Sequence, residues 1–468
     1  MGKEELLALL QKGEKAHFFN LSPTEHQQVI NELSAPNYGK PVGLALQVGT
    51  GRSDATLVFK FLGLEGDTIR KEVIDCHSMY SVHNAGYKSK SAKKMRRHAK
   101  LFLDGDFPAT GREKNSPYFT MLLAQAHRVT GMDKFLAKIG GTEIVDSALK
   151  TACNYWDLQF PHVQVPGIPK IVSLKNNFHG RSIAAVALSS NPKTRKRFSL
   201  KTPGLINDVP FDDIPALRKT FEEHRGEIAG LILEPIQGEG GIYVPHPDYH
   251  RFVRELCTEY GVLLIWDEIQ TGMGRVGSKN PEHLFAYQDY GVKPDLVCIG
   301  KAAGGGIVPF SLLAGRKDVM DCATPDGATW SAHPLGALMF SCAVEVALRE
   351  HLALQSCNKG WCFKSLLEKR ICSAYPDVFK EIRGRGLFIG AEVNGSFATG
   401  REFSYALLLN GVWSKETGAD GQTLRLTPPL TISYRQINAC LTAIEKAIHL
   451  IENDKEKIVK ALAYQESL

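Results

Sequence analysis

The chain has 468 residues, a mass of 51.6 kDa and a hydrophobic fraction of 43%, enough for two or three domains with large cores. Its 56 basic and 50 acidic residues leave a formal charge of +6, too mild a balance for a dedicated nucleic-acid binder. The sequence also lacks a long apolar stretch and a signal peptide, so we expect no membrane partner and a cytoplasmic location.

Ten cysteines are scattered between Cys76 and Cys440 without a C-x-x-C pair. Disulfide frameworks are typical of small secreted chains, and zinc sites need clustered cysteines and histidines. We therefore expect free thiols that act as small apolar residues, and no metal site.

The first hundred residues give only short signals. Amphipathic periodicity predicts helices at Lys3–Gly13 and Pro23–Leu33. Strands are predicted at Leu57–Leu62 and Glu72–Asp75, on either side of a glycine-containing turn.

From about residue 115, apolar β-branched runs alternate with helical stretches. The predicted strands are Ile171–Leu174, Ile228–Leu233, Val262–Trp266, Asp295–Ile299 and Phe310–Ala314. Helices are predicted between some of them, at Glu143–Tyr155 and Pro247–Tyr260. Strands that are apolar throughout indicate helices on both faces of a mainly parallel sheet, so this part is an α/β domain. In such domains, functional residues gather beyond the carboxyl ends of the strands.

The pattern changes again after a long helix predicted near Leu335–Leu354. The elements predicted beyond it are helices at Trp361–Ser373, Tyr405–Asn410 and Arg435–Glu452, and strands at Leu387–Val393 and Gln422–Leu426. This succession indicates a smaller α+β domain that begins near residue 350.

Two strand ends carry residues suited to chemistry. Asp267 ends one apolar run, and a buried carboxylate is costly unless it is paired, so it either caps a turn or meets a cation supplied by a ligand. Lys301 follows the next strand among glycines, where an amine can form a Schiff base. Alone, Lys301 would read as an exposed loop lysine, but two such features at neighbouring strand ends favour a site.

Several motifs around these strand ends resemble the class III aminotransferases, pyridoxal-phosphate enzymes of fold type I that include the ornithine, lysine 6- and 4-aminobutyrate aminotransferases. The motifs are Glu234–Gly241, Asp267–Gly277, Pro294-Asp295 and Gly300-Lys301. The resemblance implies a large cofactor domain over residues 111–350 and a small α+β domain over residues 351–468. It also implies that residues 1–110 add to the small domain and to a dimer interface.

The resemblance implies a role for each residue around pyridoxal phosphate. Lys301 would hold the cofactor and later move a proton, and Asp267 would pair with the pyridine nitrogen and keep it protonated. Gln270 would bind the phenolic oxygen, and Phe178 would stack on the ring. Two further residues are placed at the cofactor by the same motifs, His179 and Glu234.

The phosphate site implied by the resemblance is a helix N-terminus at Gly141 and Thr142. Gly140 stands where the family usually has serine, and His333 stands where it usually has asparagine. Thr329 would reach the phosphate of the partner subunit, so the resemblance implies a homodimer with shared active sites.

Four residues are implied in substrate binding. Arg181 occupies a carboxylate-binding position, with a structural ion pair as the alternative. Glu239 and Arg425 resemble a switch pair in which the acid masks the arginine for one substrate and frees it for the next. Tyr80 would lie near the α-amino group of the substrate, although a role in the core is equally consistent with the sequence.

The resemblance implies an aminotransferase that moves the amino group of an ω-amino or diamino acid to a 2-oxo acid by a ping-pong mechanism. Ornithine, lysine and 4-aminobutyrate are the candidate donors, and 2-oxoglutarate is the expected acceptor. Two alternatives stay open: another pyridoxal-phosphate reaction, as in an aminomutase, racemase, decarboxylase or bond-forming enzyme, and a non-catalytic descendant kept as a binding protein.

Overall fold

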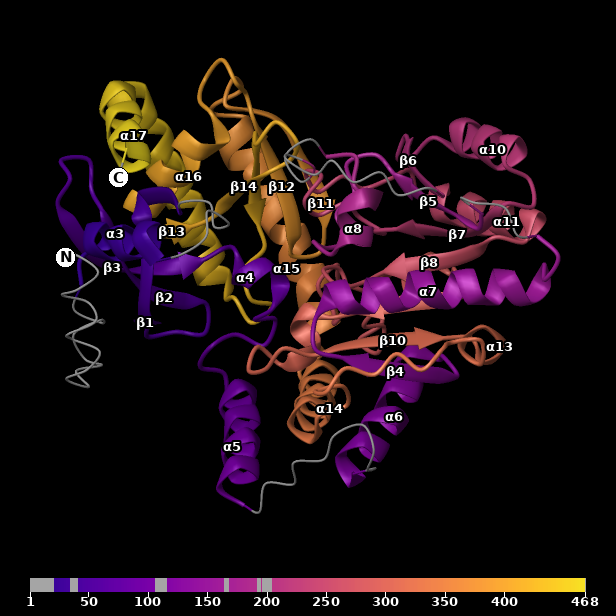
Figure 1. Cartoon of the computed structure of the whole chain (residues 1–468). Coiled ribbons are helices and arrows are strands. Elements are labelled where there is room, and N and C mark those ends of the chain that lie inside the picture. The colour runs from indigo at the N-terminus through magenta and orange to yellow at the C-terminus, as the bar shows by residue number, and fades with distance from the viewer. Residues whose placement is uncertain are drawn as a thin grey trace.

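The computed structural model describes residues 21–33, 41–105, 116–163, 168–191, 195 and 204–467. The helix expected at Lys3–Gly13 lies outside these residues. The described elements form a seven-stranded sheet with helices on both faces and two smaller four-stranded sheets beside it (Figure 1).

The seven-stranded sheet has the strand order β4-β10-β9-β8-β7-β5-β6. Its strands are β4 (Lys134–Lys138), β5 (Lys170–Leu174), β6 (Leu205–Val209), β7 (Ile228–Leu233), β8 (Leu263–Asp267), β9 (Leu296–Ile299) and β10 (Ser311–Gly315). Only β10 runs antiparallel to its neighbours, so the prediction of a mainly parallel sheet is confirmed. The two strands that were not predicted, β4 and β6, are the edges of the sheet, where sequences are less uniformly apolar.

Both faces of this sheet are buried. Ile232, Ile265 and Cys298 pack with helix α7 (Gly141–Gln159) in one apolar cluster, and their neighbours Leu264 and Val297 belong to the main core on the other face. The other helices around the sheet are α6 (Pro117–Thr130), α8 (Ile183–Leu188), α10 (Ile214–Glu223), α11 (Tyr249–Tyr260) and α14 (Pro334–Arg349). Alternate residues of each central strand therefore serve opposite layers, as expected of an α/β domain.

The C-terminal part is built on an antiparallel sheet of order β11-β12-β15-β14. Its elements are β11 (Phe379–Arg385), β12 (Phe388–Val393), β14 (Lys415–Thr417), β15 (Thr423–Leu426), and the helices α15 (Leu352–Leu366), α16 (Gly400–Leu409) and α17 (Tyr434–Ser467). The predicted α+β arrangement is confirmed, with a parallel-rich sheet and a separate antiparallel sheet in one chain.

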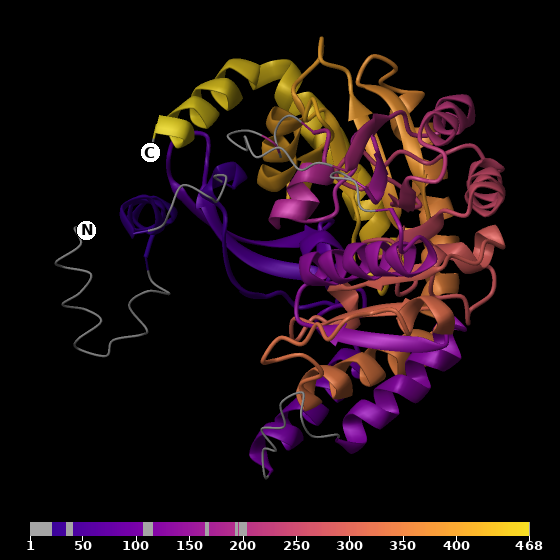
Figure 2. The same cartoon turned by 45° about the vertical axis from the view of Figure 1, so that its right-hand side comes forward.

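A third sheet joins the two ends of the chain. It contains β1 (Leu46–Thr50), β2 (Thr56–Leu62), β3 (Thr68–Asp75) and β13 (Val412–Trp413), in this order. Strand β13 pairs in parallel with β3, and Gly43 N donates to Gln465 Oε1 of α17 over 2.9 Å. The indigo N-terminal strands accordingly lie beside the yellow C-terminal helix in both views (Figure 1; Figure 2).

The single helix predicted at Leu335–Leu354 is wrong, because the chain turns between α14 and α15. His351 adopts a left-handed conformation with φ of 50°, and α15 begins at the next residue. The side chain of Gln355 donates to Glu350 O over 2.6 Å and so satisfies one carbonyl at the break. No glycine or proline marks this turn, so the apolar periodicity of the two helices was interpreted as that of one continuous helix.

The remaining described helices are short or lie at the periphery. They are α3 (Pro23–Leu33), α4 (Ser78–Ser81), α5 (Lys90–Asp104), α12 (Ala286–Tyr290) and α13 (Lys317–Met320). Across the described residues, none of the helices combines the length and apolar character needed to cross a bilayer.

Candidate active site

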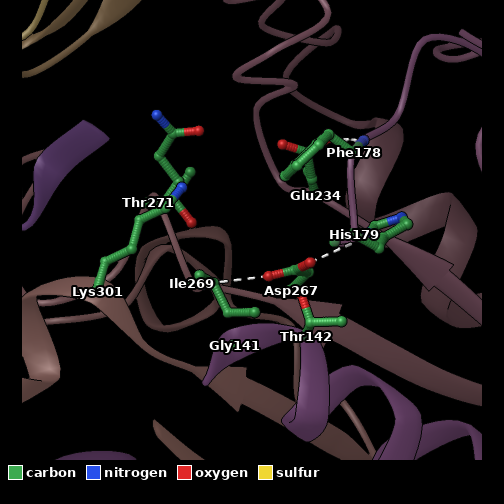
Figure 3. A pocket seen from close by; sticks show the side chains of 11 residues that line it. Gly141, Thr142, Phe178, His179, Glu234, Asp267, Ile269, Thr271 and Lys301 are labelled. Carbon is green, nitrogen blue, oxygen red and sulfur yellow. Dashed lines mark hydrogen bonds and ion pairs between the residues drawn. The ribbon is translucent and has the colours of Figure 1, made fainter. Parts of the chain in front are cut away.

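A cavity of about 180 Å³ lies at the carboxyl ends of β8 and β9. Every residue that the sequence placed at the cofactor lines it except Thr329: Gly141, Thr142, Phe178, His179, Glu234, Asp267, Gln270 and Lys301. Figure 3 shows Lys301 on one side and Asp267 with His179 on the other. The two neighbouring strand ends therefore open into one cavity.

Asp267 is the last residue of β8 and is almost fully buried. Its Oδ2 lies 2.7 Å from His179 Nδ1, and its Oδ1 accepts from Ile269 N over 3.0 Å (Figure 3). The other ring nitrogen of His179 is buried and has no partner within the described part of the chain. These two contacts fix the position of the carboxylate at the wall of the cavity.

Glu234 holds the loop that carries Phe178. Its two carboxylate oxygens accept from Phe178 N over 2.9 Å and from Gly238 N over 3.0 Å. Burial raises the pKa of Glu234 to about 7, although His179 and the two amide donors act in the opposite direction. The sequence motif indicated a direct role at the cofactor, whereas the contacts show Glu234 fixing two backbone segments around the cavity.

Lys301 directs its side chain into the cavity from the turn after β9. Its φ is 48°, in the left-handed region that non-glycine residues seldom adopt, and such strain is typical of functional positions. Burial lowers the pKa of Lys301 to about 8, while Glu239 raises it and Arg425 lowers it further. A substantial share of the amine is therefore neutral, and hence nucleophilic, near neutral pH.

The N-terminus of α7 forms the floor of the cavity at Gly141 and Thr142. The first amides of a helix have no partner within the helix, so they are suited to an anion. Gly180 has a φ of 128°, and a Cβ at this position would lie 2.4 Å from Thr142 Oγ1. Glycine thus lets the loop after Phe178 approach the helix start. At Gly140, where the resembling family usually has serine, the backbone amide donates to Glu143 Oε2 over 2.8 Å.

Gln270 presents an unpaired donor. Its buried Nε2 has no partner among the residues that the structure describes, and its side chain lies against Gly238, where a Cβ would come within 2.2 Å of Gln270 Oε1. An unpaired buried amide is costly, so a ligand atom in the cavity is its natural acceptor.

A cluster of charged groups lies beside this cavity. Arg425 of β15 is fully buried, and its Nη2 donates to Glu239 Oε1 over 2.6 Å and to Thr417 Oγ1 over 2.8 Å. Its Nε and Nη1 have no hydrogen-bond partner among the described residues. Burial alone would raise the pKa of Glu239, but Arg425 lowers it below its ordinary value. The ion pair thus leaves part of the guanidinium available to another carboxylate.

Tyr80 lies over the Arg425 guanidinium, with the ring centroid 4.9 Å from Cζ. It belongs to α4, whose residues Ser78–Ser81 all have positive φ values between 49° and 73°. Asp75 Oδ1 holds this left-handed turn by accepting from His77 N and Ser78 N, each over 2.8 Å. Such a turn costs about 1–2 kcal/mol per residue, so the aromatic ring is placed at the expense of local strain.

Lys415 was not identified from the sequence. This lysine lies in β14, and its Nζ donates to Tyr80 OH over 2.7 Å. Strand β14 has only three residues and was not predicted, so its pairing with the strand of Arg425 could not be read from the sequence. Near Lys415, the sequence indicated only the strand at Gln422–Leu426 and the role of Arg425 within it.

Arg181 and Thr329 lie farther from these groups. Arg181 is exposed, with its Cζ 5.8 Å from the centroid of the Phe178 ring. Thr329 is exposed in the loop between α13 and α14 and does not line the cavity of its own chain. His333 caps α14 through Nδ1, which accepts from Leu335 N over 3.2 Å, so it performs the capping that an asparagine can provide.

Comparisons with known proteins agree with this arrangement. The family described as Aminotransferase class-III matches residues 65–448. An ornithine aminotransferase of Emericella nidulans is 32% identical over 93% of this chain and 92% of its own length. Ornithine aminotransferase 2 of Staphylococcus saprophyticus is 38% identical over 68% of this chain and 76% of its own length.

Solved structures give the same result. The ornithine aminotransferase from Toxoplasma gondii, with partial occupancy of PLP at its active site, has a TM-score of 0.80 at 29% identity and covers 96% of this chain and 99% of its own. The acetylornithine aminotransferase from Elizabethkingia anophelis has a TM-score of 0.74 at 27% identity, with coverage of 92% and 99%.

The residues around the cavity fit pyridoxal phosphate. They provide a buried carboxylate, an amine of lowered pKa, an aromatic ring, a free amide donor on Gln270 and a helix N-terminus. These groups match the pyridine nitrogen, the aldehyde, the ring face, the phenolic oxygen and the phosphate of that cofactor. Together with the match over most of its length, this arrangement shows that the chain belongs to the class III aminotransferases, the pyridoxal-phosphate-dependent enzymes of fold type I.

Proposed function

We propose that this enzyme transfers the terminal amino group of ornithine, or of a closely related diamino acid, to 2-oxoglutarate in two half-reactions. The observation that carries the proposal is the ion pair between buried Arg425 and half-buried Glu239, beside the cavity that Lys301 enters. One substrate must present no carboxylate to Arg425 and the other must present one, and an arginine with a removable acidic partner accommodates both. The ornithine aminotransferases among the relatives support this choice of donor.

Bound pyridoxal phosphate would supply the aldehyde for amine exchange and a ring that accepts electrons. We assign Lys301 to hold it and to carry the proton between Nζ and the substrate carbon. Asp267, oriented by His179, holds a proton on the ring nitrogen, and the His179–Asp267 distance of 2.7 Å supports this role. Phe178 covers one ring face, and Gln270 Nε2 binds the phenolic oxygen.

The phosphate is assigned to the first amides of α7 at Gly141 and to the hydroxyl of Thr142. A helix N-terminus binds an anion without a lysine. Glu234 supports the site indirectly, because it holds the backbones of Phe178 and Gly238.

For the substrate, we assign Tyr80 and Arg181 to the end of the diamino acid that carries the α-amino and carboxylate groups. Glu239 masks Arg425 while that donor is bound. It then releases Arg425 to the α-carboxylate of glutamate or 2-oxoglutarate. The exposed position of Arg181 beside Phe178 and the two unpaired nitrogens of Arg425 support these roles.

We further propose a homodimer in which Thr329 of each subunit reaches the phosphate of the other. The exposure of Thr329 outside its own cavity supports this arrangement. The proposed units are an N-terminal segment over 1–110, a cofactor domain over 111–350 and a small domain over 351–468. Cysteines that are free throughout support a reducing, cytoplasmic location.

Half-reaction kinetics test the function. Purified enzyme is mixed with ornithine, lysine, 4-aminobutyrate or glutamate, and the loss of the visible cofactor band is followed in a stopped-flow instrument. We expect rapid loss with ornithine and with glutamate, and recovery of the band on addition of 2-oxoglutarate. A product that forms without any oxo acid would indicate a mutase, racemase or decarboxylase, and the lack of a visible band would indicate a binding protein.

A further inference from the structure

Lys415 and Arg425 lie directly opposite each other on β14 and β15. They are Cα partners in the antiparallel register, so their side chains share one face of the sheet. Like charges in directly opposite positions destabilise a sheet unless something compensates them. The compensating groups are therefore informative about what this face binds.

Tyr80 contacts both cations from its strained turn. Its ring centroid lies 4.9 Å from Arg425 Cζ and 5.4 Å from Lys415 Nζ, and its hydroxyl accepts from Lys415. His77 packs against Tyr80 with ring centroids 4.2 Å apart, and burial lowers its pKa well below the ordinary value. His77 is therefore neutral at physiological pH and compensates neither cation.

Glu239 is the one acidic partner of this cation pair within the described part of the chain, and it binds Arg425. Lys415 has no carboxylate within 4.0 Å in the same residues, and it is exposed. The group thus carries two cations and one carboxylate. The group is therefore one negative charge short of neutrality, and the α-carboxylate of the substrate can supply that charge.

Glu239 is anchored next to Lys415. Its backbone carbonyl accepts from Gly418 N over 3.0 Å and from Thr417 Oγ1 over 3.1 Å. Both donors lie at the end of β14 that follows Lys415 in the chain. The field of Lys415 already contributes to lowering the pKa of Glu239, after those of Arg425 and Lys301. A rotation of the side chain, with its backbone unmoved, would leave the carboxylate in the neighbourhood of Lys415.

The carboxylate that leaves Arg425 favours a new partner, because Glu239 is only partly exposed and water cannot solvate its charge fully. Lys301 has to carry the proton to and from the substrate carbon, so it is not the partner of this carboxylate. We propose that Lys415 is a positioning residue that receives the Glu239 carboxylate when Arg425 binds the α-carboxylate of the second substrate. The inference rests on the proposed function and adds the second position of its switch. In that position, two carboxylates face two cations.

The first test compares Lys415→Met with the wild type in both half-reactions. The apparent dissociation constant for glutamate should rise by roughly tenfold or more, the usual effect of losing a hydrogen bond to a charged group. Reaction with ornithine should change by no more than a few-fold, because Glu239 then stays on Arg425 and only the hydrogen bond from Lys415 to Tyr80 is lost. Lys415→Arg should restore glutamate binding, and Lys380→Met, an exposed lysine of β11 in the same domain, is the matched control.

A double-mutant cycle separates this role from direct contact with the substrate. Glu239→Gln has no charge to relocate, so adding Lys415→Met to it should leave glutamate binding unchanged. If Lys415→Met weakens the binding of glutamate equally with and without Glu239, the lysine binds the substrate itself and the proposal is overturned.

Glutarate, a dicarboxylate without an amine, gives a readout independent of turnover. Calorimetry should show that Lys415→Met weakens the binding of glutarate in the wild-type background and not in the Glu239→Gln background. An enzyme inactive with both glutamate and 2-oxoglutarate would refute the proposed function, and the glutarate cycle would still decide the role of Lys415. Wild-type protein that does not bind glutarate would overturn the proposal for Lys415.

Discussion

At the scale of single residues, Lys301 combines two unusual properties: a positive φ and a pKa lowered to about 8 by burial. We predict that Lys301→Ala abolishes covalent attachment of the cofactor while the fold is retained. Borohydride reduction followed by mass spectrometry should show one labelled site per wild-type chain and none in the variant. Labelling of another lysine in the variant, at one site per chain, would refute the assignment.

The lowered pKa of Lys301 also predicts a pH dependence. The neutral amine attacks the aldehyde, and its share rises as the pH rises through about 8. The rate of cofactor uptake by the apoenzyme should therefore increase by about tenfold between pH 7 and pH 9. Absorbance after rapid mixing measures the rate. A rate that rises by about a hundredfold over this range and still increases above pH 9 would mean that burial does not lower the pKa of this lysine.

Asp267 is expected to act through its charge. In Asp267→Asn the cofactor should stay bound, but proton abstraction should slow by roughly 10²–10³, the typical loss for one preorganised electrostatic contact. Single-turnover kinetics with ornithine measure the step. A variant that turns over at nearly the wild-type rate would exclude the assigned role.

Some of the residues at the site could be identified from the sequence alone, and others could not. Asp267 and Lys301 were identified because a buried strand that ends in a polar residue can be recognised in the sequence, as an apolar run followed by that residue. Lys415 was missed because its importance comes from the register opposite Arg425, and register depends on the whole sheet. Glu234 was placed at the cofactor by its motif, yet its hydrogen bonds run to two backbone amides.

At the scale of elements, the left-handed turn α4 depends on Asp75. The carboxylate is fully buried and binds two backbone amides and the hydroxyl of Tyr87. We predict that Asp75→Ala lowers the free energy of unfolding by about 2–4 kcal/mol, because several buried donors lose their acceptor. Tyr87→Phe removes one of these bonds and should cost only about 1 kcal/mol. Urea denaturation of the two variants compares them.

The central strands were predicted well because both of their faces are buried, which makes their sequences apolar throughout. The elements that were missed are edges or short strands, such as β4, β6 and β14. Their sequences contain lysines and other polar residues, and they become strands through pairing with a neighbour. The helix break at His351 was missed because neither a glycine nor a proline marks it.

At the scale of the whole molecule, shared active sites predict complementation between two inactive subunits. Lys301→Ala lacks the lysine but keeps Thr329, and Thr329→Ala has the opposite pattern. A mixed dimer should contain one site with both residues intact, so mixing the unfolded variants and refolding them together should restore activity. Light scattering should give the mass of a dimer, and mixtures no more active than the separate variants would contradict shared sites.

The pairing of β3 with β13 has a consequence for the order in which the protein folds. Ile74 N donates to Gly411 O, and Cys76 N donates to Trp413 O, so strand β3 gains its last neighbour more than three hundred residues later in the chain. During synthesis, β1–β3 emerge from the ribosome long before that neighbour exists, and β3 presents an unpaired edge throughout this interval. Contacts between such distant segments form slowly, and an open edge favours association with other chains. This sheet should therefore be completed last, and truncation before β13 should produce a chain that aggregates, even though it retains the whole cofactor cavity.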